Sequence, residues 1–251
     1  MIPRIFESVG HGTVADGFWT YFEVDPRSPT VNPQQRLVRL ATRVREFLRP
    51  DGTLLSIGCG YGVYEILLSF LPSELEIIGV DILDDKRSDA KVRSMRSIAI
   101  QLRADRVSPL LADGGQLPFR SGSFDCAMAI DCLSHTDYMR GNLQLHDSQT
   151  FLLEEMTRVV RPGGHLAAIE NNGMSPRNVM RKHGTTCHPV NPLYLKSVLE
   201  KLDCTEVRIA PYYDLNDRKG PSARVVGALL EHSNTVGLLL APFFMLGARN
   251  T

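Results

Sequence analysis

Residues 54–62, with the sequence LLSIGCGYG, constrain the fold more than any other part of the chain. A short apolar run ends in three glycines at alternate positions, and an apolar helical pattern follows. Glycine lets the backbone turn tightly and lets a ligand approach without meeting a Cβ atom. The segment therefore predicts a strand, a sharp turn and a helix around a nucleotide-like ligand.

The spacing of these glycines narrows the class of ligand. A dinucleotide-binding loop needs a third glycine or alanine five positions after the first. Val63 stands there, and Gly62 comes one residue earlier. The chain also lacks the GK[ST] sequence of a triphosphate-binding loop. A nicotinamide-dependent oxidoreductase is therefore a disfavoured alternative.

Short apolar runs alternate with helical patterns along the chain. Expected strands are 53–57, 76–80, 107–111, 125–130 and 165–169. Expected helices are 33–48, 63–71, 84–102, 148–160 and 192–202, whereas 113–123 has the composition of a loop. This order predicts an α/β domain whose mostly parallel sheet has helices on both faces. Two later apolar runs, 204–210 and 243–248, are expected to pair at its edge.

Composition excludes several partners and locations. The 28 Lys and Arg residues equal the 28 Asp and Glu residues, so no overall field attracts nucleic acid or an anionic membrane. Five cysteines without a CxxC pair indicate neither a disulfide framework nor a thiolate zinc site. The longest apolar run, 236–248, is too short to span a bilayer, and the first residues lack a signal-peptide core. We expect a cytoplasmic protein without membrane insertion.

Four further motifs follow the glycine segment in order: IIGVDI around Asp81, Ala112-Asp113, LPF with SFD at 117–125, and RPGG at 161–164. Over residues 50–170 the chain resembles the class I S-adenosylmethionine-dependent methyltransferases. It is most similar to the group of ubiquinone and menaquinone biosynthesis methyltransferases. The resemblance implies a Rossmann-like, seven-stranded, mostly parallel sheet with helices on both faces and a C-terminal antiparallel strand.

The resemblance also implies that the glycine segment cradles the methionine and ribose part of S-adenosylmethionine. The loop residues expected to contact this cofactor are Gly58, Cys59, Gly60 and Gly62. The family usually has an acidic residue two positions before the first glycine, where it helps to hold the amino-acid end of the cofactor. This chain has Ser56 there, which can still form hydrogen bonds.

Two more parts of the expected cofactor site follow the second and third strands. In the family an acidic residue ending the second strand binds the ribose hydroxyls, and Asp81 stands there, followed by Ile82. A carboxylate is a strong acceptor for two neighbouring hydroxyls. Ala112 and Asp113 occupy the place where the family recognises the adenine amino group.

The protein needs to supply little chemical activation, because the methyl group of a sulfonium is already electrophilic. Holding the acceptor in line behind that carbon supplies much of the acceleration, whereas a hydroxyl acceptor also benefits from a base. His135, just past the fourth strand, is the best-placed candidate base, with packing inside its loop as the alternative. Asp131, at the end of that strand, is a second candidate for contact with cofactor or substrate.

Polar residues after the fifth strand are expected near the acceptor pocket, since ligands of open α/β sheets bind at the carboxyl ends of strands. These are Glu170, Asn171 and Asn172. No metal is expected, because His183, Cys187 and His188 lack a third firm ligand. We expect a single domain at 32–251 with a candidate substrate cap at 171–191. The aromatic-rich residues 1–31 are expected to be a lid or an edge segment.

The leading hypothesis is methyl transfer to a small-molecule acceptor, with oxygen as the first choice and nitrogen or carbon next. The alternative is a non-catalytic S-adenosylmethionine-binding protein, which Ser56 and the lack of an obvious base make conceivable. DNA is a poor acceptor, because no DPPY-like motif follows the fourth strand.

Overall fold

The computed structural model describes residues 40–49, 51–71, 74–82, 86–135, 145–176, 178, 188–212 and 234–251. Residues 40–45 are helical, so part of the first expected helix is confirmed, but the helix ends at residue 45 and not at the expected residue 48. The start of that helix and the expected lid or edge segment at 1–31 lie outside the described residues.

One seven-stranded sheet runs through the structure in the order β3-β2-β1-β4-β5-β7-β6. β7 is antiparallel to β5 and β6, and the other pairs are parallel. The strands are β1 (Asp51–Ile57), β2 (Glu74–Asp81), β3 (Val107–Leu111), β4 (Phe124–Ile130), β5 (Val160–Asn171), β6 (Thr205–Tyr212) and β7 (Phe243–Arg249). This arrangement confirms the expected fold class and the pairing of the last two apolar runs.

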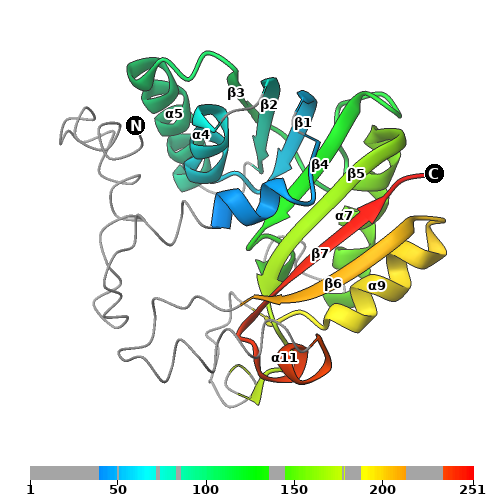
Figure 1. Cartoon of the computed structure of the whole chain (residues 1–251). Helices are drawn as coiled ribbons and strands as arrows, with labels where there is room; N and C mark the ends of the chain where they lie inside the picture. The colour runs from blue at the N-terminus through cyan, green and yellow to red at the C-terminus, as the bar shows by residue number, and fades with distance from the viewer. Residues whose placement is uncertain are drawn as a thin grey trace.

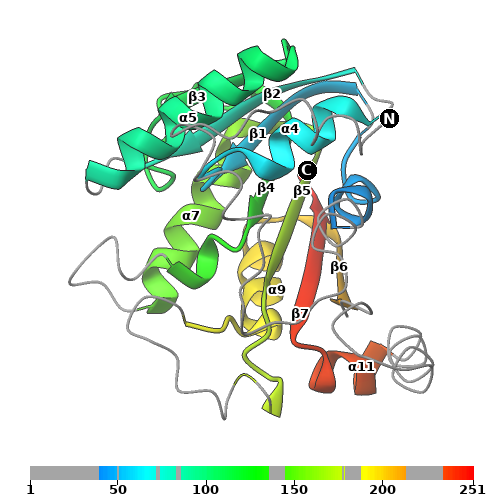
Figure 2. The same ribbon diagram turned by 90° about the vertical axis from the view of Figure 1, so that its left-hand side faces the viewer.

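Helices cover both faces of this sheet (Figure 1). The helices are α4 (Val63–Phe70), α5 (Lys86–Leu102), α7 (Leu145–Val159), α9 (Pro192–Lys201) and α11 (Asn234–Leu240), with a short 3-10 turn, η1 (Leu133–His135). Figure 2, turned by 90°, shows α4 and α5 over β1 to β3, whereas α7 and α9 lie against β4, β5, β7 and β6. Among the described residues, no helix is long and apolar enough to cross a membrane.

Successive residues of the central strands enter opposite cores. Leu54 of β1 packs with α4, α5 and residues 40–48, whereas its neighbour Leu55 packs with α7 and α9. Both side chains are fully buried. Because side chains alternate across a strand, a central parallel strand needs apolar residues on both faces. The continuous apolar run of β1 therefore follows from its central position.

Local chemistry fixes the ends of other elements. Asn191 caps α9, since its side chain accepts hydrogen bonds from the amides of Leu193 and Tyr194, and Pro192 takes the first turn, where no amide bond is needed. Pro109 lies in β3, which pairs only with β2 at the edge of the sheet. An edge strand tolerates the missing amide hydrogen of proline.

The structure differs from the sequence prediction in two places. Residues 161–164 (RPGG) do not precede the fifth strand but lie inside it. Val160 at the start of β5 already pairs with Phe124 at the start of β4, and the pairing of these two strands shifts in register after that point. Gly163 has a positive φ of 77°, and its amide donates to the carbonyl of Asn250. The second difference is α11 (Asn234–Leu240), a helix that the sequence pattern did not predict, whereas β7 follows the expected run 243–248.

Replacing Phe244 on β7 by alanine tests the second core. Phe244 has 0% exposure, and removing a buried ring leaves a cavity that costs roughly 3 to 5 kcal/mol. Urea unfolding measures the loss. Ile100→Ala on α5 is the control: Ile100 is 70% exposed, so that change is expected to stay within about 0.5 kcal/mol. Equal losses in both variants would contradict the burial described here.

Candidate functional site

The glycine loop between β1 and α4 is fastened to the end of β2. The amides of Gly58 and Cys59 both donate to the carbonyl oxygen of Val80, at 2.8 and 3.0 Å. The amide of Gly60 donates to Oδ2 of Asp81 at 2.7 Å. The loop is therefore held in one shape by the strand that also carries the expected ribose-binding carboxylate.

The glycines of this loop serve different purposes. Gly62 caps α4 with φ 75° and is buried, and a Cβ atom there would lie 2.7 Å from Sδ of Met95 on α5. Packing against Met95 therefore excludes a side chain at Gly62. A Cβ at Gly60 would meet nothing closer than Oδ2 of Asp81 at 4.0 Å. Of the two, Gly60 is the one beside which a ligand has room.

The ends of β2 and β3 meet beside the glycine loop. Asp81 is half-buried, and its Oδ1 accepts from the amide of Ile82 at 2.8 Å. The amide of Ala112 donates to the backbone carbonyl of Asp81 at 2.9 Å. Asp113 turns the chain, because its Oδ1 accepts from the amide of Gly115 at 2.8 Å. The structure thus brings together the expected ribose and adenine residues.

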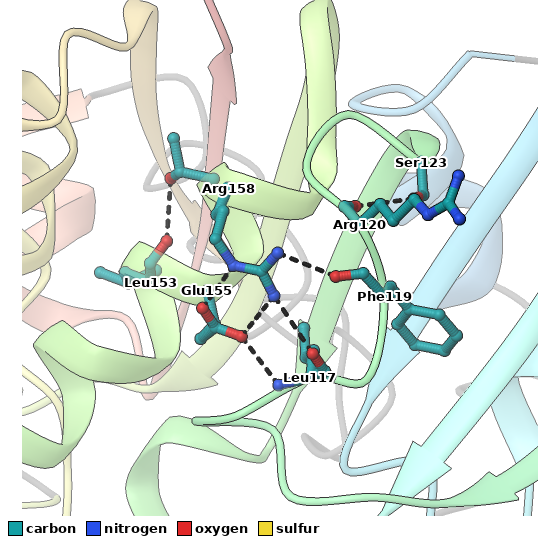
Figure 3. Close-up of polar contacts among 8 residues, drawn as sticks. Leu117, Phe119, Arg120, Ser123, Leu153, Glu155 and Arg158 are labelled. Carbon is teal, nitrogen blue, oxygen red and sulfur yellow. Dashed lines mark hydrogen bonds and ion pairs between the residues drawn. The ribbon is translucent and has the colours of Figure 1, made fainter.

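The LPF motif has a structural role that its sequence did not reveal. Oε2 of Glu155 on α7 accepts from the amide of Leu117, and Arg158 donates to the carbonyls of Leu117 and Phe119. Figure 3 shows the Arg158 side chain lying between Glu155 and these carbonyl groups. Hydrogen bonding from Arg158 lowers the pKa of Glu155. The loop between β3 and β4 is therefore anchored to α7.

A buried carboxylate organises the turn after β4. Glu170 on β5 accepts hydrogen bonds from the amides of Cys132, Leu133 and Ser134, at 2.7, 2.6 and 3.3 Å. Burial and the charge of Asp131 raise the pKa of Glu170 to about 8. Because these amides occupy its carboxylate oxygens, Glu170 supports the turn and is not directed toward an acceptor substrate.

Asp131 and His135 both belong to this turn. Asp131 is exposed, has the positive φ of 50°, and accepts from the Asn171 side chain at 2.7 Å. His135 is half-buried at the end of η1. A Cβ atom at Gly58 would lie 2.6 Å from Sγ of Cys132, so the turn directly abuts the glycine loop. Asp131 therefore directly precedes the residue that contacts the glycine loop, whereas His135 lies three residues beyond Cys132 on the same turn.

Asn172 belongs to the fold and is not turned toward a ligand. It is fully buried, and its side-chain amide donates to the carbonyls of Leu238 and Ala241. No group of three metal-binding side chains occurs within the part of the chain that the structure describes. His183 and Cys187 lie outside the described residues, as do residue 177 and the rest of 179–187 in the candidate cap.

The structure adds Glu65, which the sequence reasoning did not select. The Ser56 hydroxyl donates to Oε1 of Glu65, and Glu65 is 1% exposed. Its other oxygen, Oε2, is buried and has no hydrogen-bond partner within the part of the chain that the structure describes. Burial, aided by the charge of Asp81, raises the pKa of Glu65 to about 7. The sequence signal that could have indicated Glu65 is the presence of a glutamate on the otherwise apolar face of α4, VYEILLSF.

Cys59 shares these surroundings. Burial raises the pKa of its thiol well above the ordinary value, and the charges of Glu65 and Asp81 act in the same direction. Since the thiolate is the reactive form of cysteine, Cys59 is an inert small residue of the loop.

Comparison with known proteins agrees with this geometry. Residues 55–168 match a family described as a methyltransferase domain. An O-methyltransferase of Pyrenophora dematioidea is 24% identical over 224 residues, which cover 83% of this chain and 77% of that protein. The ubiquinone/menaquinone biosynthesis C-methyltransferase UbiE of Geotalea daltonii is 27% identical over 136 residues, covering 53% of this chain. The chain spans about half of the length of that UbiE protein, 51%.

A solved structure shares the fold. The geranyl diphosphate C-methyltransferase of Streptomyces coelicolor A3(2), crystallised with Mg2+, geranyl-S-thiolodiphosphate and S-adenosyl-L-homocysteine, superposes with a TM-score of 0.61. The match covers 88% of this chain and 78% of that chain at 16% identity. At this identity the similarity is one of fold.

Glu65→Gln is expected to change how stability depends on pH. The carboxyl group loses its proton near 4.5 when unfolded and near 7 when folded. The unfolded state therefore releases the proton first as pH rises, and wild-type stability falls across this window by up to about 3 kcal/mol. Urea unfolding at pH 5 and 8 should show a smaller fall for Glu65→Gln.

The exposed residue Glu76 on β2 provides the control for this measurement. Glu76→Gln should lose as much stability as the wild type between the two pH values. Parallel losses for wild type and Glu65→Gln would contradict the raised pKa of Glu65.

Proposed function

We propose that this chain, an S-adenosylmethionine-dependent methyltransferase of the Rossmann-like class whose residues 55–168 match a methyltransferase domain, methylates a small-molecule acceptor. Oxygen is the first candidate atom, followed by nitrogen or carbon. The observation that carries the proposal is the meeting of the glycine loop, Asp81 and Asp113 at the carboxyl ends of β1, β2 and β3.

The residues at this edge of the sheet fit the cofactor. Gly60 leaves room for a ligand beside the loop, and the half-buried Asp81 carboxylate suits two ribose hydroxyls. Asp113 and Ala112 follow β3, where they would meet the adenine, and Ile82 follows Asp81. When bound, the cofactor supplies an electrophilic methyl group. The protein has only to orient the acceptor behind that carbon and keep water away.

The turn after β4 supports an oxygen acceptor. Asp131 and His135 lie on a turn that Glu170 holds against the glycine loop. In this position His135 would accept the proton of a hydroxyl group as the oxygen attacks. The similar protein of Pyrenophora dematioidea is an O-methyltransferase by name, whereas the similar UbiE protein of Geotalea daltonii is a C-methyltransferase by name. A carbon acceptor is therefore the main competitor.

Calorimetry with S-adenosylmethionine and S-adenosylhomocysteine tests the cofactor assignment. Wild-type protein should bind both, and Asp81→Ala should weaken binding by roughly 10- to 100-fold, because hydrogen bonds to a charged group contribute about 1.5 to 3 kcal/mol. Asp81→Asn should give an intermediate loss, since it retains an acceptor for the Gly60 amide. Asp105→Ala, at an exposed site preceding β3, is the control. Unaltered affinity in Asp81→Ala would refute the ribose-binding role.

A radiolabelled methyl-transfer screen against metabolite extracts identifies the acceptor, and His135→Ala then tests the base. If the product is methylated on oxygen, kcat should fall roughly 10²- to 10⁴-fold, with the acceptor KM little changed. His165→Ala, midway along β5 and six residues before its carboxyl end at Asn171, should retain activity. A fall of less than about threefold in His135→Ala would mean that His135 is not the base. Cofactor binding without transfer to any acceptor would favour the non-catalytic alternative.

A further inference from the structure

The Ser56–Glu65 pair leaves one buried carboxylate oxygen unsatisfied. Oε1 of Glu65 accepts from the Ser56 hydroxyl, whereas Oε2 has no partner among the described residues. A buried polar atom without a hydrogen bond is costly, and a charged one more so. An interaction that the described residues do not provide is therefore needed at Oε2.

The surroundings of Glu65 favour a cation. The charge of Asp81 on β2 acts unfavourably on an ionised Glu65, and no compensating positive charge contributes to the pKa of Glu65. None of the ion pairs within the described part of the chain includes Glu65. Glu65 lies in the first turn of α4, where the helix dipole favours a negative charge. This position does not by itself supply a hydrogen-bond donor to Oε2. A positively charged donor would satisfy both the charge and the free oxygen.

The position of the Ser56–Glu65 pair in the fold indicates which cation Oε2 would meet. Ser56 precedes Gly58 by two residues at the carboxyl end of β1, and α4 begins directly after the glycine loop. The pair therefore lies beneath the part of the loop expected to hold the methionine portion of the cofactor. The amino-acid end of that portion carries an ammonium group with three N–H donors.

We propose that Glu65, oriented by Ser56, binds the ammonium group of the cofactor, and so supplies from α4 a carboxylate that β1 lacks. The inference rests on the proposed function, since it requires S-adenosylmethionine in this site. Oε2 of Glu65 accepts a hydrogen bond from the ammonium, while Oε1 remains bound to Ser56. Ser56 is a positioning residue that fixes the carboxylate.

Two ligands that differ in the amino-acid end test this assignment by calorimetry. S-Adenosylhomocysteine carries the ammonium group, whereas 5′-methylthioadenosine keeps the adenosine and the sulfur but lacks the amino acid. Glu65→Gln should weaken the binding of S-adenosylhomocysteine by roughly 10- to 100-fold, as expected for the loss of a hydrogen bond between charged groups. Its affinity for 5′-methylthioadenosine should stay within about threefold of wild type.

A compensating variant separates binding from structure. In Ser56→Asp/Glu65→Gln the carboxylate returns to β1, so affinity for S-adenosylhomocysteine should recover over the single Glu65→Gln variant. Glu76→Gln on β2 is the matched control and should bind both ligands as wild type does. Thermal unfolding verifies that each variant is folded.

Two results would overturn the proposal. One is unchanged affinity of Glu65→Gln for S-adenosylhomocysteine, and the other is equal weakening of both ligands, which would indicate a disturbed loop. If wild-type protein binds neither ligand, the cofactor assignment itself fails. The outcomes therefore distinguish failure of the Glu65 role from failure of the proposed function.

The pH dependence of binding gives a measurement that needs no variant. The ammonium group requires the ionised carboxylate, and the pKa of Glu65 is about 7 in the ligand-free protein. Below that pH, binding must expel a proton, so affinity for S-adenosylhomocysteine should fall by up to about tenfold per pH unit. Affinity for 5′-methylthioadenosine should change much less between pH 8 and 6. Identical pH profiles for the two ligands would contradict the role of Glu65.

Discussion

The carbonyl oxygen of Val80 accepts hydrogen bonds from two successive amides of the glycine loop, and the next residue, Asp81, accepts a third from Gly60. These bonds fasten the end of β1 to the end of β2. A shift of the loop would break these bonds and leave backbone donors unpaired, which is costly where they are buried. α4, Asp81 and the turn after β4, which abuts Gly58, take their places around this fixed backbone.

Carboxylates gather at the same edge of the sheet. Glu65 and Glu170 are fully buried, and burial raises the pKa of each. Glu170 is satisfied by three backbone amides and so fixes the turn that carries Asp131 and His135. Among the described residues, Glu65 finds a hydrogen-bond partner for one oxygen only. The difference separates a carboxylate that supports the fold from one that is suited to a ligand.

Sequence periodicity predicted the elements wherever local pattern and tertiary position agree. The apolar run of β1 and the helical pattern of α4 lie close to their predicted bounds. Prediction was less accurate where distant contacts decide the backbone. Val160 joins β5 ahead of RPGG because it pairs with Phe124. The residues of α11 pack against β6, a contact that their apolar sequence does not encode.

The sequence by itself determined the fold class and the place of the cofactor loop, because strand alternation and glycine spacing are local properties of the chain. Only the tertiary structure decided what individual residues do. Met95 excludes a side chain at Gly62, Glu155 and Arg158 hold the LPF loop, and the Ser56 hydroxyl meets Glu65. Each of these contacts joins different elements of the fold, and burial sets its consequence. Neither the partner nor the burial is a property of a residue's neighbours in sequence.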